Sequence, residues 1–235
     1  MSRHTDRTAR VLGVDACRAG WVGVVLDGDR ATAHVASGIA DLVEQASVDG
    51  QPAVVGVDMP IGLPDHGPRQ ADQLARRAVG RLRSSVFTTP TRPALEAPDH
   101  RTASARNREL TGKGVSIQAF GLKPKLLEVD QWVRRAAVNV VEVHPEVSFA
   151  RLAGAPLDVG KRTHFGVARR HELLREAGVT LEGVLGAVVR GVGVDDVLDA
   201  TVVAWSARRV AAGCAVAIPD PPEVFSDSWP AAIWI

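Results

Sequence analysis

The chain has little of what marks secreted, zinc-binding or membrane-spanning proteins. Its 235 residues include two cysteines, Cys17 and Cys214, which lie far apart and form no CxxC pair. A zinc knuckle or a disulfide framework is therefore not expected, and a reducing cytoplasm is the simpler setting. No apolar run approaches the roughly 18 residues that a membrane span needs, and residues 1–10 lack the apolar segment of a signal peptide. We therefore expect a cytoplasmic protein with no membrane partner.

A large excess of one charge is also missing. The 28 lysine and arginine residues nearly balance 27 aspartate and glutamate residues, so the formal net charge is +1. Contact with nucleic acid would therefore have to come from a local basic patch. Apolar residues make up 46% and charged residues 23% of the chain, which is typical of globular proteins. With no repeat and no convincing linker, the sequence predicts one domain over 10–235 after a disordered tail at 1–9.

Apolar runs and turn residues predict an ordered succession of strands and helices. Three short β-like runs come first, and a wholly apolar run later in the chain is typical of a strand buried on both faces. Residues 59–137 form a long, irregular insertion, and 231–235 could form an apolar edge. The expected strands are 11–15, 21–27, 30–36, 53–58 and 138–149, and the main expected helices are 37–46, 163–178 and 192–213. This order predicts an α/β fold with an RNase H-like mixed five-stranded sheet, although other mixed sheets obey the same connection rules.

Acidic residues stand where these elements could bring them together. Asp15 ends the first strand, Asp58 ends the fourth, and Asp196 and Asp199 share one face of the last helix. Two like charges about 4 Å apart repel by about 4 kcal/mol at an effective dielectric constant near 20, so such a cluster needs a counter-cation. Oxygen ligands without a thiolate select Mg²⁺ or Mn²⁺. Two such ions could clamp the attacking and leaving oxygens of a phosphodiester, so the pattern predicts a two-metal carboxylate site.

Each acid also has a plainer explanation. Asp15 and Asp58 could be turn residues that close a strand. Asp196 could stabilise the helix N-terminus through charge–dipole attraction. Asp199 is harder to explain in this way, because aspartate is a poor helix former and the neighbouring residues are mostly apolar. The joint placement of the acids favours the metal site.

Two further groups are candidate functional residues. Glu142 could add a metal ligand, and His144 could carry a proton near neutral pH. A polar strand face before a proline turn explains this pair equally well. Arginine forks and hydroxyl groups in the insertion suit phosphate oxygens, with a solvated basic surface as the alternative. These candidate substrate-binding residues are Arg83, Ser84, Ser85, Lys123 and Lys125.

Six stretches occur in a fixed order between about residues 11 and 213. They read GVDACRAGW, VGVDMPIGLPD, RSSVFTTPTR, QAFGLKPKLLEVD, VVEVHPEVSFARL and DDVLDATVVAWSARR. This series resembles the uncharacterised family of predicted RNase H-like nucleases, domain of unknown function 429. The chain departs from the family at Ala19-Gly20, where Gly-Gly is usual, and at Thr88-Thr89-Pro90, where Pro-Thr-Pro is usual. The resemblance implies an RNase H-like fold and, by inference from that fold, a nuclease.

The sequence is compatible with three functions from different classes. The favoured prediction is a metal-dependent nuclease that uses Mg²⁺ or Mn²⁺ on DNA or RNA. The second is a phosphotransferase of the actin-like and sugar-kinase type, although Cys17 and Arg18 stand where such proteins need glycine and a small hydroxyl residue. The third is a binding module without chemistry, whose expected sign, the loss of the acids, is not seen. A fold does not by itself imply a function, so all three remain open.

Overall fold

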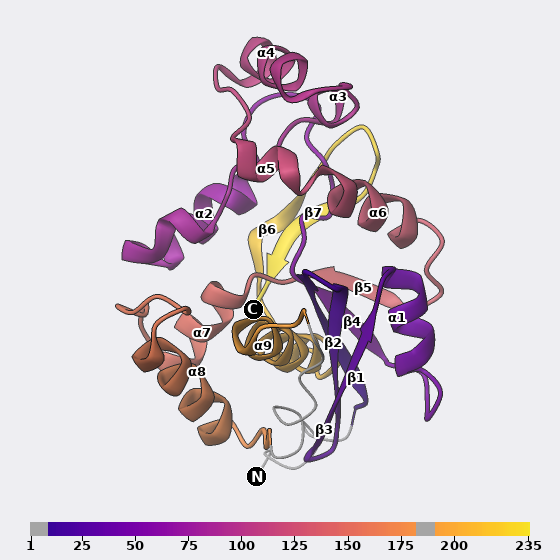
Figure 1. Ribbon diagram of the computed structural model, residues 1–235, viewed down its shortest axis with the longest axis vertical. Coiled ribbons are helices and arrows are strands. Elements are labelled where there is room, and N and C mark those ends of the chain that lie inside the picture. The colour runs from indigo at the N-terminus through magenta and orange to yellow at the C-terminus, as the bar shows by residue number, and fades with distance from the viewer. Residues whose placement is uncertain (1–8, 182–190) are drawn as a thin grey trace.

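The computed structural model describes residues 9–181 and 191–235, which form a mixed seven-stranded sheet with helices on both faces (Figure 1). The expected disordered tail, apart from Ala9, lies outside the described residues. The strand order in the sheet is β3-β2-β1-β4-β5-β7-β6. The strands are β1 (Val11–Cys17), β2 (Gly20–Asp27), β3 (Arg30–Ala36), β4 (Val54–Val57), β5 (Asn139–Glu142), β6 (Ala217–Val224) and β7 (Pro230–Trp234).

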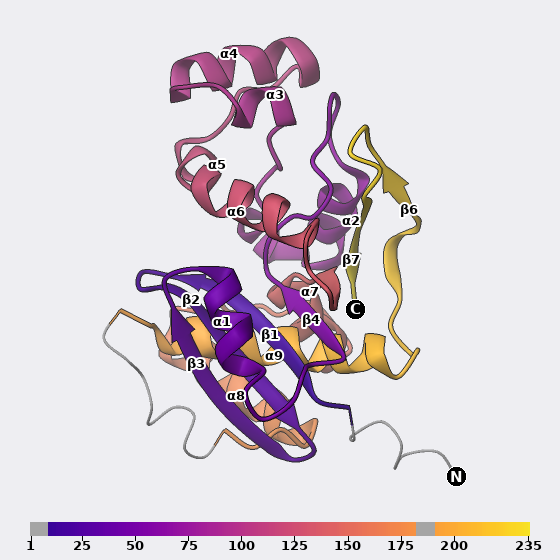
Figure 2. The same ribbon diagram turned by 90° about the vertical axis from the view of Figure 1, so that its right-hand side faces the viewer.

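Helices cover the two faces of the sheet unequally (Figure 2). Helices α1 and α6 pack on one face, and α7, α8 and the long α9 pack on the other. The described part of the chain contains no helix that is long and apolar enough to cross a membrane. The helices are α1 (Ile39–Ala46), α2 (Gln70–Ala78), the 3-10 helix η2 (Gly80–Ser85), α3 (Arg92–Leu95), α4 (His100–Thr111), α5 (Ile117–Gly121), α6 (Lys123–Val133), α7 (Pro145–Ala153), α8 (His164–Glu176) and α9 (Val194–Ala211).

The register of the central strands places acids near the C-terminal ends of these strands. Strand β1 is antiparallel to β2 and parallel to β4, and Val14 of β1 pairs with Val57 of β4. The next residue in each chain segment is an aspartate, and the Asp58 backbone N–H donates to the Val14 carbonyl at 2.9 Å. Strand β5 continues the parallel order, with Glu142 opposite Val57. Asp15 and Asp58 therefore reach the same level of two adjacent strands, and Glu142 lies one residue before that level on the third.

Helix α9 lies unusually close to these strands. A Cβ atom at Gly13 of β1 would lie 2.1 Å from the Ala200 carbonyl oxygen, and one at Gly56 of β4 would lie 2.9 Å from the Val203 side chain. Glycine on the strands and small residues such as Ala204 on the helix permit this approach. As a result, the first half of α9 passes beside the last part of β1. Asp15 lies there within the strand, because β1 continues to Cys17 and not only to the expected residue 15.

The sheet differs from the expected five-stranded one at its C-terminal side. Residues 231–235 were expected at an edge, but β7 lies inside the sheet, parallel to β5 and antiparallel to β6. Strand β6 carries Pro219, Pro221 and Pro222, which make the sequence unlike a strand. Because β6 is the edge strand and its register shifts between Ile218 and Glu223, these prolines are tolerated.

The expected strand at 138–149 was too long. The strand ends at Glu142, and α7 begins three residues later at Pro145. Proline suits the first helical turn, because its missing N–H would have no partner in the helix there. Pro145 was expected from the sequence to form a turn after a polar strand face. In the structure, Pro145 is the first residue of a helix.

The close contact between β1 and α9 gives a stability prediction. Gly13→Ala should reduce the free energy of unfolding by about 1–3 kcal/mol, because the added methyl group would overlap the α9 backbone rather than a side chain that can move. Urea denaturation followed by circular dichroism measures this loss.

Gly121→Ala is the matched control. Gly121 ends α5, and a Cβ atom there would meet nothing within 4 Å. Alanine is also the better helix former, so this variant should be as stable as the wild type or slightly more stable. Wild-type stability of Gly13→Ala would contradict the close packing of α9.

Candidate metal centre

Three aspartates from separate elements meet at the end of the central strands. Ligand oxygens of Asp15, Asp58 and Asp199 all lie within 4.8 Å of one another. Asp15 and Asp199 are buried, and Asp58 is partly exposed. We call these three residues the carboxylate cluster. The fourth predicted ligand, Asp196, is not in the cluster, because its Oδ2 accepts a hydrogen bond of 2.9 Å from the Gly193 backbone N–H at the start of α9.

Burial and mutual repulsion change the acidity of the whole cluster. Burial, followed by the negative charge of Asp199, raises the pKa of Asp58 to about 8. Burial raises the pKa of Asp199 to about 6, although the nearby Lys161 opposes this shift. The pKa of Asp15 is raised well above its ordinary value by burial and by the charges of Asp58 and Asp199. The three carboxylates therefore need a compensating cation to be ionised together at neutral pH.

Part of that compensation comes from Lys161, which the sequence analysis missed. Lys161 lies in the loop between α7 and α8, and its ammonium donates a hydrogen bond to Asp199 Oδ2. Although burial acts in the other direction, the charges of Asp199 and Asp15 raise the pKa of Lys161. No spacing or periodicity distinguishes this lysine from others in polar loops. Only the path of the loop reveals it.

A divalent cation fits the remaining ligand atoms. Asp199 Oδ1 is buried and has no hydrogen-bond partner among the described residues. An ionised oxygen left in this state costs free energy, which a coordinated cation would recover. The donors of the carboxylate cluster are all carboxylate oxygens, and hard divalent cations prefer such ligands. The residues present therefore suit a hard metal ion.

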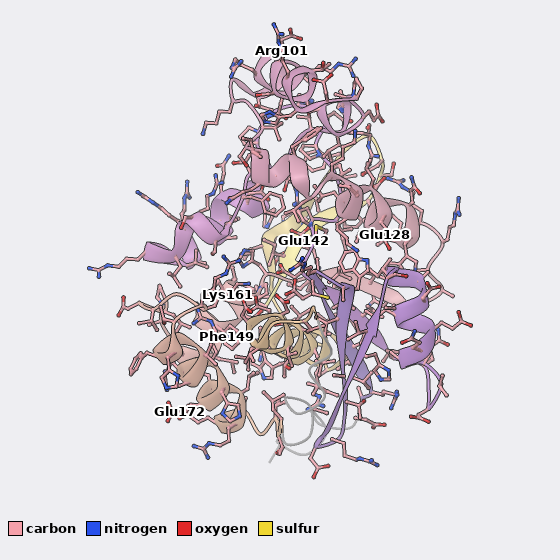
Figure 3. All side chains as sticks on the ribbon, viewed as in Figure 1. Arg101, Glu128, Glu142, Phe149, Lys161 and Glu172 are labelled. Carbon is pink, nitrogen blue, oxygen red and sulfur yellow. The ribbon has the colours of Figure 1, made fainter. Side chains whose placement is uncertain are left out.

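The carboxylate cluster opens into a cavity of about 270 Å³, which we call the acidic cavity. Its wall also includes Glu142 and His144 from the predicted site, and apolar residues such as Phe87. Figure 3 shows Glu142 and Lys161 in the middle of the molecule, between the sheet and the helices beside it. The acidic cavity is thus lined both by carboxylates that could bind a cation and by apolar side chains.

Glu142 lines the acidic cavity but is already hydrogen-bonded through both of its oxygens. The fully buried Arg69 donates to Oε1 at 3.2 Å and to Oε2 at 2.6 Å. The Ile61 backbone N–H also donates to Oε2, at 2.7 Å. Arg69 in addition forms an ion pair with Asp72 at 3.2 Å. Glu142 therefore lies beside the carboxylate cluster, in an ion pair with Arg69, and not within the group of three.

His144 lies on the wall of the same cavity as a neutral imidazole. Burial lowers its pKa to about 4, while the backbone of Ser85 acts in the opposite direction. Its Nδ1 is buried and has no hydrogen-bond partner in the described part of the chain. A neutral imidazole can accept a proton but does not supply a positive charge at pH 7.

The predicted phosphate contacts divide into two groups. Ser85 lines the acidic cavity, while Arg83 and Ser84 line a neighbouring cavity of about 480 Å³. The two cavities share residues Val86 and Phe87 in their walls. Ser85 therefore lines the same cavity as the carboxylate cluster, while Arg83 and Ser84 line the adjoining one.

The two predicted lysines of α6 have other contacts. Lys123 donates to the Ala97 carbonyl. Lys125 lies 4.3 Å from the centre of the Trp21 ring and 3.6 Å from a Glu128 oxygen. Neither lysine lines the acidic cavity. Their contacts are those of residues that hold α6 to its surroundings.

Comparison with known proteins gives a match to one family model. The model of a family described as "Protein of unknown function (DUF429)" matches residues 13–224, which include every residue of the carboxylate cluster. No curated protein and no solved structure matches the chain. The description of the family assigns no activity, so the chemistry has to be inferred from the site itself.

The raised pKa of Asp58 predicts that the site destabilises the metal-free protein. Asp58 has a pKa of about 8 in the folded protein, whereas the ordinary pKa of an aspartate, as in the unfolded chain, is 3.8. The unfolded chain therefore ionises first as the pH rises, and stability falls across this window. Asp58→Asn removes the effect, so in EDTA this variant should melt at a higher temperature than the wild type, with a larger difference at pH 8 than at pH 5.

Asp65→Asn provides the control for the thermal unfolding measurements. The Asp65 carboxylate accepts hydrogen bonds from the side chain and backbone of Ser226, and these bonds lower its pKa. Its removal should bring no gain in melting temperature at pH 8. An unchanged difference between Asp58→Asn and the wild type from pH 5 to pH 8 would contradict the raised pKa.

Proposed function

The chain belongs to the DUF429 family, and from its carboxylate cluster we propose that it is a metal-dependent nuclease with an RNase H-like core. It would hydrolyse phosphodiester bonds of DNA or RNA with Mg²⁺ or Mn²⁺. The observation that carries this proposal is the convergence of Asp15, Asp58 and Asp199 within 4.8 Å, from two strands and a helix. Three such acids destabilise the fold unless they bind a cation, because each carboxylate is desolvated and repelled by the others.

The order of the strands supports the RNase H-like part of the proposal. Three antiparallel strands are followed by two parallel ones in the order β3-β2-β1-β4-β5. The acids lie in the last part of β1, directly after β4 and on α9, which are close to the places that this fold predicts for them. Strands β6 and β7 extend the sheet beyond that core.

The chemistry follows from what the residues of the acidic cavity can hold. A bound divalent cation would supply Lewis-acid activation of the attacking water and neutralise charge on the phosphate. The carboxylate cluster would fix the position of this cation. His144, neutral at pH 7, could accept a proton from the water directly or through the solvent. Phe87 and other apolar residues form part of the wall of the same cavity.

Charge separation along the chain supports a nucleic-acid substrate. Residues 59–137 contain 14 lysine and arginine residues but 7 aspartate and glutamate residues, a formal charge of +7 in a chain whose total is +1. We call 59–137 the basic segment. It includes α2–α6, which lie beyond one end of strands β1–β3 (Figure 2). Arg83 and Ser84 of this segment line the cavity next to the carboxylate cluster. A polyanion bound along the basic segment would therefore have a phosphate near the acids.

Loss of the aspartates tests the nuclease directly. The wild type should bind Mn²⁺ in calorimetric titrations and cleave at least one labelled single-stranded, duplex or branched DNA or RNA. Asp15→Asn and Asp199→Asn should each reduce cleavage by about 10³-fold, or about 4 kcal/mol of transition-state stabilisation, because each removes a ligand for the cation.

Asp195→Asn is the matched control for both measurements. Asp195 also lies in the first part of α9, but its carboxylate lies 3.8 Å from the exposed Arg162 and outside the carboxylate cluster. This variant should bind Mn²⁺ and cleave as the wild type does. Absence of Mn²⁺ binding by the wild type would overturn the nuclease and favour a binding module without chemistry.

The basic segment predicts a salt-dependent contact through Arg83. Arg83→Ala should weaken binding of the cleaved nucleic acid to a similar extent for all sequences, and should reduce the slope of log affinity against log salt concentration by about 1. Fluorescence anisotropy without added metal measures both quantities. Arg30→Ala removes an exposed arginine at the start of β3, outside the basic segment, and should leave the slope unchanged. Equal slopes for Arg83→Ala and the wild type would contradict the contact.

A further inference from the structure

A lysine ammonium already lies among the carboxylates. Lys161 donates to Asp199 Oδ2, and 33% of its side chain is exposed. Among the described residues that line the acidic cavity, Lys161 alone is a lysine or arginine. Asp199 therefore presents one oxygen that is bound by the chain's own cation and one, Oδ1, that has no partner in the described part of the chain.

The loop that carries Lys161 is held by buried charge. Arg170 of α8 is fully buried, and it donates to both oxygens of Glu146 of α7 at 2.7 Å. The same guanidinium donates to the Val159 carbonyl at 3.1 Å, two residues before Lys161, and lies 5.4 Å from the centre of the Phe149 ring. Figure 3 marks Phe149 and Lys161. A buried ion pair has a large desolvation cost, and its contact here holds the backbone of the loop in place. The core of the protein therefore anchors the loop two residues before Lys161.

The charges around the acidic cavity leave room for one divalent cation. Glu146 is paired with Arg170, and Glu142 shares Arg69 with Asp72. The carboxylate cluster lacks an arginine partner among the described residues and has Lys161 instead. Three ionised carboxylates and one ammonium carry a charge of −2, which a single divalent cation balances. A second divalent cation would leave the site at +2 and would have to compete with Lys161 for Asp199.

We propose that Lys161 is the built-in counter-cation of the carboxylate cluster, so that the cluster takes one divalent cation and the ammonium takes the place of a second. This departs from the two-metal site that the sequence predicts. The unpartnered Oδ1 of Asp199 is available to the cation, while Oδ2 stays with Lys161.

The same position gives Lys161 a role towards the substrate, and this part rests on the proposed nuclease function. An ammonium has three N–H donors, of which Asp199 Oδ2 accepts one. The partly exposed side chain lines the acidic cavity, so its ammonium can direct another donor towards an oxygen of the phosphate that is cleaved. Lys161 would then stabilise the charge that develops on the phosphate, which a second metal ion would otherwise do.

The number and affinity of bound Mn²⁺ ions test the counter-cation. Calorimetry and electron paramagnetic resonance should count one Mn²⁺ in the wild type. Lys161→Met should bind Mn²⁺ at least tenfold more tightly, because it leaves the carboxylates with no internal cation, and Lys161→Gln provides a second neutral variant. Lys161→Arg keeps the charge and should stay within threefold of the wild type. Two Mn²⁺ ions in the wild type, or no gain in affinity in the neutral variants, would overturn the proposal.

Arg162→Gln is the matched control in the same loop. Arg162 is adjacent in sequence, its side chain is 88% exposed, and it lies outside the carboxylate cluster. Loss of this charge should change the Mn²⁺ affinity by less than threefold. A tenfold gain here would overturn the proposal, because it would show that any positive charge in the loop has the same effect. Circular dichroism confirms that each variant is folded.

Cleavage rates separate the two parts of the proposal. Lys161→Met should cleave at least tenfold more slowly at saturating Mn²⁺ despite its tighter metal binding, with partial rescue in Lys161→Arg. A purely structural role would weaken metal binding and cleavage together. If the metal measurements give the expected result but no substrate is cleaved, the counter-cation stands and the nuclease fails. If Lys161→Met cleaves at the wild-type rate, the substrate contact is overturned.

Discussion

The site depends on how closely one helix can approach the sheet. Gly13 and Gly56 leave the surfaces of β1 and β4 flat where α9 crosses them, and no larger residue fits at Gly13 without moving the helix backbone. This contact brings Asp199 beside Asp15, while the parallel register of β1 and β4 places Asp58 next to both. A distance measured between carboxylates is thus set by backbone packing far more than by the acids themselves, which repel one another.

The same packing explains why the acids need a cation. Backbone contacts hold the carboxylates in a buried place, so they cannot relieve their repulsion by moving apart, and their pKa values rise instead. The neighbouring acids have arginine partners: Arg69 pairs with Glu142, and Arg170 pairs with Glu146. The protein therefore neutralises the acids that support the acidic cavity and leaves the cluster only partly compensated. Such an arrangement lowers stability where a ligand is to be bound.

The sequence predicts the parts of this site that repeat a local pattern. Asp15 and Asp58 each follow an apolar strand, and Asp199 interrupts an apolar helix, so their residue types and spacing are visible without a structure. Lys161 and Arg69 carry no such pattern, because a loop and a helix N-terminus bring them to the acids. Glu142 was expected as a ligand since the sequence does not reveal that Arg69 binds both of its oxygens. The edge strand β6 was missed because its prolines are acceptable only at an edge, and that place follows from pairing with β7.

The distribution of charge suggests the order in which the metal ion and the substrate would bind in the proposed function. Under the proposed function, the basic segment would attract a polyanion. The cluster at its border would repel the phosphate to be cleaved as long as Lys161 alone compensates the acids. A single divalent cation brings the cluster to neutrality without removing the lysine. A phosphate could then approach the Lys161 ammonium and the metal ion together, inside a cavity whose wall is otherwise largely apolar. In the proposed function, metal binding should therefore precede productive substrate binding. The near-zero net charge of the whole chain combines a basic segment and an acidic cluster of opposite charge.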